Sequence, residues 1–113
     1  MSRKLVYIAA PHSGNGTHFT DDIKGNIEFA KRAARFAINK GVMPFVPHLM
    51  YPILLEDNTP EEHALRIEFN HAMLTKCDEL WYFTGHGISD GMHQTFEFAK
   101  AHGIPVVDIP LKV

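Results

Sequence analysis

The chain has 113 residues, of which 45% are hydrophobic and 21% charged, with a formal net charge of −2 at pH 7. These values are ordinary for a folded domain and argue against disorder. Because acidic and basic residues are interspersed and nearly balanced, the chain has no field to attract a nucleic acid polymer or an anionic membrane surface. We expect residues 1–113 to form a single domain with a modest core.

Targeting signals and disulfides are also disfavoured. The apolar run near the N-terminus is too short for a signal peptide, and no stretch approaches the roughly 18 apolar residues of a membrane span. The single cysteine, Cys77, excludes an internal disulfide and a multi-cysteine zinc site. These features predict a cytoplasmic protein.

Short apolar runs alternate with longer periodic segments, which is the pattern of a parallel α/β sheet. A strand is predicted over Lys4–Ala9, followed by a helix over Asp22–Asn39 with Thr20 or Asp21 as N-cap and Gly41 just after its end. Its predicted inner face holds Ile23, Ile27, Ala30, Ala34 and Ala37.

The second strand is predicted over Val42–Val46, where Pro44 removes a hydrogen-bond donor and favours an edge position or a strand start. The next helix should begin at Pro60, capped by Thr59 with Glu62 completing a capping box, and should end at Leu74 or Lys76. Its inward residues are predicted to be Leu65, Phe69 and Ala72 or Met73.

A third strand is predicted over Glu79–Phe83, then a loop over Thr84–Ser89 and a helix that begins at Asp90 or Gly91 and ends before Gly103. The last strand is predicted over Ile104–Ile109. With right-handed crossovers, these elements predict an α/β fold with a small parallel sheet of four or five strands between helical layers, a three-layer arrangement of the flavodoxin or Rossmann type.

The loop before the third helix is the predicted binding site. The start of a helix offers unpaired backbone N–H groups and the positive end of a dipole, so it favours phosphate or carboxylate. The first loop, residues 11–17, carries small residues and hydroxyls that could also approach a phosphate. It fits neither the P-loop nor the G-x-G-x-x-G pattern, so a polar turn without a ligand is the alternative.

The eight histidines do not form a metal-binding pattern. There is no H-E-x-x-H, no cysteine partner and no pair at ligand spacing, so neither a metal nor another cofactor is expected, and His48 is a candidate pocket residue. Asp78, just ahead of the third strand, is either a surface residue at the strand entrance or a pocket carboxyl able to act as acid or base.

The apolar segment Leu49–Leu55 is a candidate for burial against a second subunit. We therefore expect a homo-oligomer. The alternative is that this segment folds back over the core of its own chain.

Several motifs resemble the small uncharacterised relatives of the nucleoside 2-deoxyribosyltransferases over nearly the whole chain. They are Tyr7–Pro11, Pro44–His48, Cys77–Trp81, Ser89-x-Gly91-Met92 and Gly103–Val106. The resemblance implies one nucleoside 2-deoxyribosyltransferase-like domain with a pocket for a nucleoside or nucleotide, in which a glutamate attacks the sugar carbon of the N-glycosidic bond.

The same resemblance assigns roles to residues. It implies that Tyr7 orients the nucleophile, that Asp78 transfers a proton at the base, and that Ser89 meets a phosphate, as in the nucleoside 5′-monophosphate N-glycosidases. The implied substrate-binding residues are Ala9, Pro11, His12, Ser13, Gly14, His48, Ser89, Gly91 and Met92.

The chain departs from this family at the nucleophile, because Thr95 stands where the glutamate is expected. Glu97 is no substitute, since two residues along a helix rotate a side chain by about 200°. A threonine hydroxyl without a general base is a poor nucleophile, so direct attack by water with help from Asp78 would be slow. Three alternatives remain: an N-glycosidase or deoxyribosyltransferase, a nucleotide-binding protein that has lost the nucleophile, and a domain used for protein contact alone.

Overall fold

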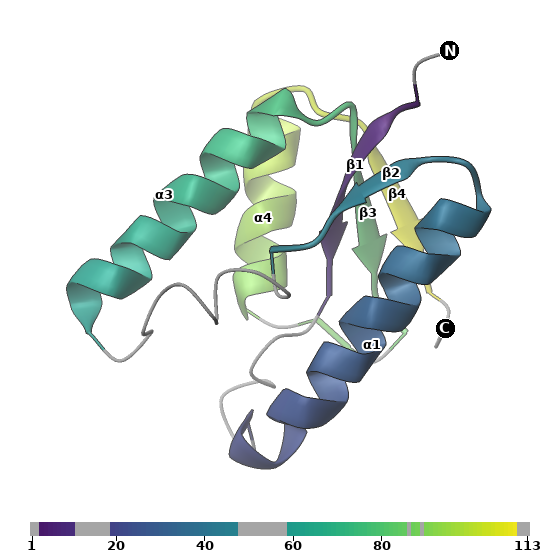
Figure 1. Ribbon diagram of the computed structural model, residues 1–113. Coiled ribbons are helices and arrows are strands. Elements are labelled where there is room, and N and C mark those ends of the chain that lie inside the picture. The colour runs from purple at the N-terminus through teal and green to yellow at the C-terminus, as the bar shows by residue number, and fades with distance from the viewer. Residues whose placement is uncertain (1–2, 11–18, 48–58, 86, 89, 111–113) are drawn as a thin grey trace.

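In the computed structural model, which describes residues 3–10, 19–47, 59–85, 87–88 and 90–110, strands and helices alternate along the chain as predicted (Figure 1). None of the described helices is long and apolar enough to cross a membrane. The elements are β1 (Leu5–Ala9), α1 (Phe19–Asn39), β2 (Met43–Phe45), α3 (Pro60–Lys76), β3 (Glu79–Phe83), α4 (Asp90–Ala101) and β4 (Val106–Ile109).

The four strands form one parallel sheet in the order β2-β1-β3-β4. This confirms a small parallel α/β sheet of four strands, consistent with a Rossmann-like fold. The chain leaves β1 in one direction to form β2 and then returns to the other side of β1 to form β3. Such a reversal of strand order is a topological switch point, and ligands of open α/β sheets bind outside the carboxyl ends of the strands at that point.

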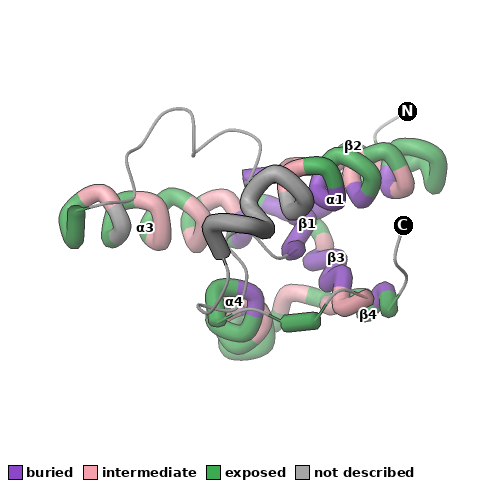
Figure 2. The backbone as a smooth tube through the Cα atoms, turned by 90° about the horizontal axis from the view of Figure 1, so that it is seen from below, coloured by how far each residue is buried: buried purple, intermediate pink, exposed green. Residues whose placement is uncertain are grey.

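Helices cover both faces of the sheet, with α1 on one face and α3 and α4 on the other (Figure 2). Successive side chains of a strand point to opposite faces. Val6, Ile8, Trp81 and Phe83 therefore pack toward α1, whereas Tyr7, Ala9, Leu80 and Tyr82 pack toward α3 and α4. Burial on both faces explains why β1 and β3 are continuous apolar runs without polar alternation.

Local signals set most of the element boundaries. Gly41 has φ 88° and Gly103 has φ 69°, a left-handed backbone that favours glycine and ends a helix. Pro44 lies in the edge strand β2, as predicted. The prediction for the start of α1 is wrong: Thr20 and Asp21 lie within the helix, which begins at Phe19, because both residue types are also compatible with a first helical turn.

The start of α3 is as predicted, whereas its inner face is not. The Thr59 hydroxyl accepts a hydrogen bond of 3.1 Å from the Glu62 N–H, and Pro60 occupies the first turn. Leu65 and Phe69, predicted to face inward, are 38% and 36% exposed, and Ala72 is exposed as well. Apolar residues occur on more than one side of α3, so periodicity does not choose which side is buried.

Cys77 provides a test of the packing where α3 meets β3. It is buried beside Leu74 and Leu80, and burial, followed by the charge of Asp78, raises the pKa of its thiol to about 11. We expect a thiol-labelling reagent at mildly alkaline pH to react roughly 100-fold more slowly with the native protein than with the unfolded chain, because the thiolate is the reactive form. Similar labelling rates with and without denaturant would contradict this packing.

Candidate functional site

The carboxyl ends of β1 and β3 meet at the switch point, where α4 begins. The first turn of α4 contains Asp90, Gly91 and Met92, of which Gly91 is exposed and Met92 is buried. The unpaired N–H groups of this turn and the helix dipole give it a positive potential. Asp90 brings a negative charge to the same turn, so an anion bound there would need a further cation nearby.

Aromatic side chains line the sheet on the side of α3 and α4. The rings of Tyr82 and Phe96 stack with their centroids 5.2 Å apart, and those of Tyr7 and Phe45 lie 5.7 Å apart. Burial, followed by the charges of Asp108 and Glu97, raises the pKa of the Tyr82 phenol. This hydroxyl therefore stays protonated at neutral pH and can donate a hydrogen bond.

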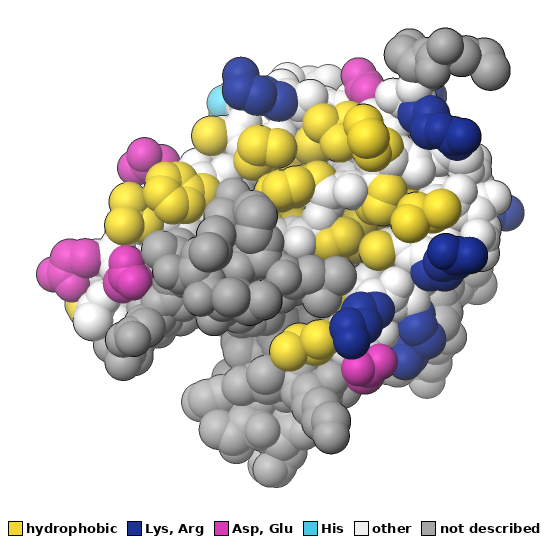
Figure 3. Space-filling view, in the orientation of Figure 1, with side chains coloured by type: hydrophobic (Ala, Val, Ile, Leu, Met, Phe, Trp, Pro, Cys, Tyr) yellow, Lys and Arg dark blue, Asp and Glu magenta, His cyan; other side chains and the backbone are white. Residues whose placement is uncertain are grey.

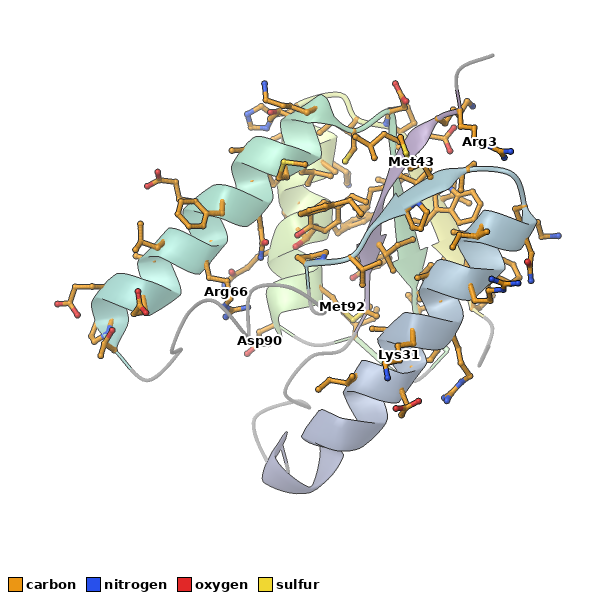
Figure 4. The ribbon with its side chains drawn as sticks, in the orientation of Figure 1. Arg3, Lys31, Met43, Arg66, Asp90 and Met92 are labelled. Atoms are coloured by element: carbon orange, nitrogen blue, oxygen red, sulfur yellow. The ribbon has the colours of Figure 1, made fainter. Side chains whose placement is uncertain are left out.

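Two polar residues on α3, outside every motif of the sequence described above, face this region. Arg66 and Asn70 are one helical turn apart, in the same row as the buried Leu74. Figure 4 shows Arg66 pointing from α3 toward the start of α4, where Asp90 lies. The signal that could have identified them is their four-residue spacing with Leu74, which places both on the inner side of the helix.

Asn70 carries the most informative polar atom of the site. Its Oδ1 is buried and accepts no hydrogen bond from the described residues. An unsatisfied buried acceptor costs about 1–3 kcal/mol, so such atoms are rare in native proteins and call for an explanation. A ligand with a hydroxyl or amine donor would provide one.

Asp78 lies elsewhere than in the predicted pocket. Its Oδ2 accepts a hydrogen bond of 2.8 Å from the Leu5 N–H, at the end of the sheet where β1 and β3 begin. The length of β3, roughly 16 Å for five residues, separates this end of the sheet from the start of α4. All strands of a parallel sheet begin at the same end of the sheet. An acid just before β3 and the residues that follow β3 therefore lie at opposite ends of the strand. The structure matches the alternative of a residue at the strand entrance.

Thr95 lies on the side of α4 that faces the sheet, in the same row as Met92 and Ala99. Its hydroxyl donates a hydrogen bond of 2.9 Å to the Gly91 carbonyl, within the helix. Glu97 is exposed, and its Oε1 lies 3.8 Å from the Nε2 of His93, which is one turn earlier on the outer side of α4. This agrees with the prediction that Glu97 points away from the position of Thr95.

The structure therefore brings several predicted site residues to one side of the sheet: Tyr7, Ala9, Gly91, Met92 and Thr95. Other predicted residues lie outside the described residues, namely Pro11, His12, Ser13, Gly14, His48 and Ser89. Within the described part of the chain, no group of three or more His, Cys, Asp or Glu residues could hold a metal ion.

Residues 4–109, which include every element from β1 to β4, match the model of a domain of unknown function, DUF7768. The chain belongs to this family. No curated protein matches it. The family description names no activity, so the resemblance to nucleoside 2-deoxyribosyltransferases stays a prediction for this DUF7768 domain.

An aromatic stack holds α3 against α4 in the DUF7768 domain. The ring of Phe98 lies between those of His71 and His102, with centroids 4.1 Å and 4.0 Å away. Burial, followed by the charge of His102, lowers the pKa of His71. Because His71 is next to Asn70 in α3, this stack also fixes where Arg66 and Asn70 lie relative to α4.

The lowered pKa of His71 predicts a loss of stability in mild acid. Above about pH 6.5, the ordinary pKa of histidine, His71 is neutral in both the folded and the unfolded chain. As the pH falls from about 6.5 toward the lower folded pKa, the unfolded chain takes up the proton first, so the free energy of unfolding decreases. Denaturant titrations across this range should show the decrease, and His71→Gln should reduce its slope. His93→Gln, a change of the same kind at an exposed site, is the control, and an unchanged slope in His71→Gln would contradict the prediction.

Proposed function

We propose that this domain binds a small phosphorylated nucleoside, such as a nucleoside 5′-monophosphate, between α3 and the start of α4. Binding, rather than glycosyl transfer, is the function that the geometry supports best. The observation that carries the proposal is the buried Oδ1 of Asn70, which accepts no hydrogen bond from the described residues and lies one turn from Arg66. The resemblance in the motifs supports the same class of ligand.

The phosphate would bind at the start of α4. The backbone N–H groups of the first turn point toward that end, but the carboxylate of Asp90 already offsets part of the dipole. Arg66 supplies the additional positive charge, and its planar guanidinium suits two oxygens of a phosphate at once.

The nucleoside would lie along the inner side of α3. The Oδ1 of Asn70 can accept a hydrogen bond from a ribose hydroxyl or from an amino group of a base. The half-buried ring of Phe96, which stacks on the buried Tyr82, would provide apolar surface on α4. Apolar walls with a few placed polar groups are typical of small-molecule sites.

The two residues to which the resemblance assigns the nucleophile and the acid of glycosyl transfer are not arranged for these roles. A covalent mechanism needs a carboxylate nucleophile and a second carboxyl group as acid. Thr95 occupies the expected nucleophile position, and its hydroxyl already donates to Gly91. Asp78 lies at the opposite end of the strands, where β1 and β3 begin. No charged side chain is fully buried in the described part of the chain.

Binding can be tested by thermal shift and calorimetry with nucleosides and their 5′-monophosphates. A monophosphate should raise the melting temperature more than its nucleoside, because a ligand that binds the native state stabilises it. Arg66→Gln should weaken monophosphate binding by about tenfold or more, since a hydrogen bond to a charged group contributes about 1.5–3 kcal/mol. Arg35→Gln removes the same charge from an exposed site on α1 and should leave binding unchanged.

Asn70→Leu separates a binding residue from a structural one. Replacing an unsatisfied acceptor by an apolar group of similar size should keep or raise the free energy of unfolding while weakening ligand binding. Asp78→Asn should leave binding unchanged. The proposal fails if no nucleotide stabilises the protein, or if Asn70→Leu and Arg66→Gln bind as well as the wild type.

A slow N-glycosidase is the second candidate, and the shared packing of Tyr7, Met92 and Ala99 favours it. These residues belong to one buried cluster, so position 95, between Met92 and Ala99 on α4, faces the side of the sheet that holds Tyr7. A carboxylate there would occupy the place that the resemblance assigns to the nucleophile.

Thr95→Glu should therefore create or raise the release of free base from a nucleoside monophosphate, measured by chromatography. The control is Gln94→Glu, which adds the same charge at the exposed neighbouring position. A folded, ligand-binding Thr95→Glu variant that releases no more base than Gln94→Glu would exclude position 95 from the reacting centre.

A further inference from the structure

A stack of three rings connects α3 to the end of α4. His71 comes from α3, Phe98 from the last turn of α4 and His102 from the position just after it. The ring planes are 19° and 20° from parallel, and the His102 Nδ1 donates a hydrogen bond of 2.9 Å to the Phe98 carbonyl. His102 is therefore fixed to α4, and His71 is the ring that α3 contributes to this ring stack.

The packed position of His71 disfavours a proton on its ring for two reasons. The ring is half-buried, so a charged imidazolium would lose hydration. His102 lies on the opposite face of Phe98, roughly 8 Å away, which is about one Debye length at physiological salt. Both effects lower the pKa of His71, burial more than the charge of His102. Outside the stack, the ring would have the ordinary pKa of histidine, about 6.5.

Groups that favour the proton do not reverse this direction. The face of the Phe98 ring attracts a cation, and the exposed carboxylate of Glu68 lies one turn before His71 on α3. The sheet contributes apolar side chains to the cluster that contains Phe98. The other charged residues at this end of the two helices are exposed to water, where charges contribute little: Lys76, Asp78 and Lys100. Mild acid therefore favours a state in which the His71 ring has left the stack.

The helix α3 is the element that such a change can release. Among its described side chains, Leu74 is the one that is fully buried. Figure 3 shows hydrophobic side chains at the surface over α3, and Leu65 is 38% exposed. Segments with few buried apolar side chains open at a lower free energy than the rest of a domain. Loss of a contact with α4 would therefore release α3 before the sheet unfolds.

We propose that the ring stack is an acid-sensitive contact, which holds α3 against α4 while His71 is neutral and releases α3 when His71 binds a proton. The contact is complete above about pH 6.5 and weakens as the pH falls below that value. A released α3 would carry Arg66 and Asn70 away from the first turn of α4. Ligand binding would then weaken in mild acid. This consequence rests on the proposed function, whereas the opening of α3 does not.

The native Cys77 reports the opening. It is buried in the cluster that α3 and α4 cover, so a reagent reaches its thiol when α3 moves away. We measure its labelling by a pyridyl disulfide, divided by the labelling rate of the unfolded chain at the same pH. This relative rate should rise about threefold or more as the pH falls from about 7.5 to about 5.5. It should also exceed the rate that global unfolding allows, which denaturant titrations followed by the fluorescence of the single tryptophan, Trp81, provide.

Matched variants assign the effect to the ring stack. His71→Phe keeps an aromatic ring against Phe98 and cannot bind a proton, so it should abolish the rise in the relative labelling rate. His71→Gln should do the same without a larger ring. His93→Gln removes a histidine from the exposed side of α4 and should keep the rise. A wild-type relative rate that does not change with pH, or an equal rise in both folded His71 variants, would overturn the inference.

Calorimetry with a nucleoside 5′-monophosphate tests the consequence for the site. The same fall in pH should weaken binding about threefold more in the wild type than in His71→Phe. Comparing the two proteins removes the titration of the phosphate itself, whose second pKa is about 6. An equal loss of affinity in both proteins would show that the ring stack does not control the site. No binding at either pH would refute the proposed function, and the labelling of Cys77 would still decide whether α3 opens.

Discussion

Both faces of the central β1–β3 pair are buried, and this constraint places the other described elements. Val6, Ile8, Trp81 and Phe83 require cover from α1, whereas Tyr7, Leu80 and Tyr82 require cover from α3 and α4. Right-handed crossovers then fix which helix covers which face. The order β2-β1-β3-β4 follows, and with it a switch point between β1 and β3 at the edge where α4 begins.

The helix α3 carries one unfavourable feature on its inner side. The Oδ1 of Asn70 is buried without a described hydrogen-bond partner. Such an acceptor costs free energy in the isolated domain. A small polar ligand that donates a hydrogen bond to this oxygen would offset that cost.

Local signals in the sequence were reliable where a single residue decides the backbone. Thr59 caps α3, Gly41 and Gly103 end helices, and Pro44 sits in an edge strand, all as expected from the chemistry of those residues. Signals that depend on a neighbouring element were not. Leu65 was expected inside but is exposed. The prediction failed because a helix with apolar residues on several sides gives no information about which side the sheet will meet.

The sequence alone determined the alternation of strands and helices and the parallel sheet, because continuous apolar runs and helical periodicity are properties of neighbouring residues along the chain. Only the tertiary structure decided the composition of the site. Asp78 is near the candidate loop in sequence, yet it lies at the opposite end of the sheet because the length of β3 separates the two. Arg66 and Asn70 are distant from α4 in the sequence, yet they face it because α3 and α4 cover the same face of the sheet.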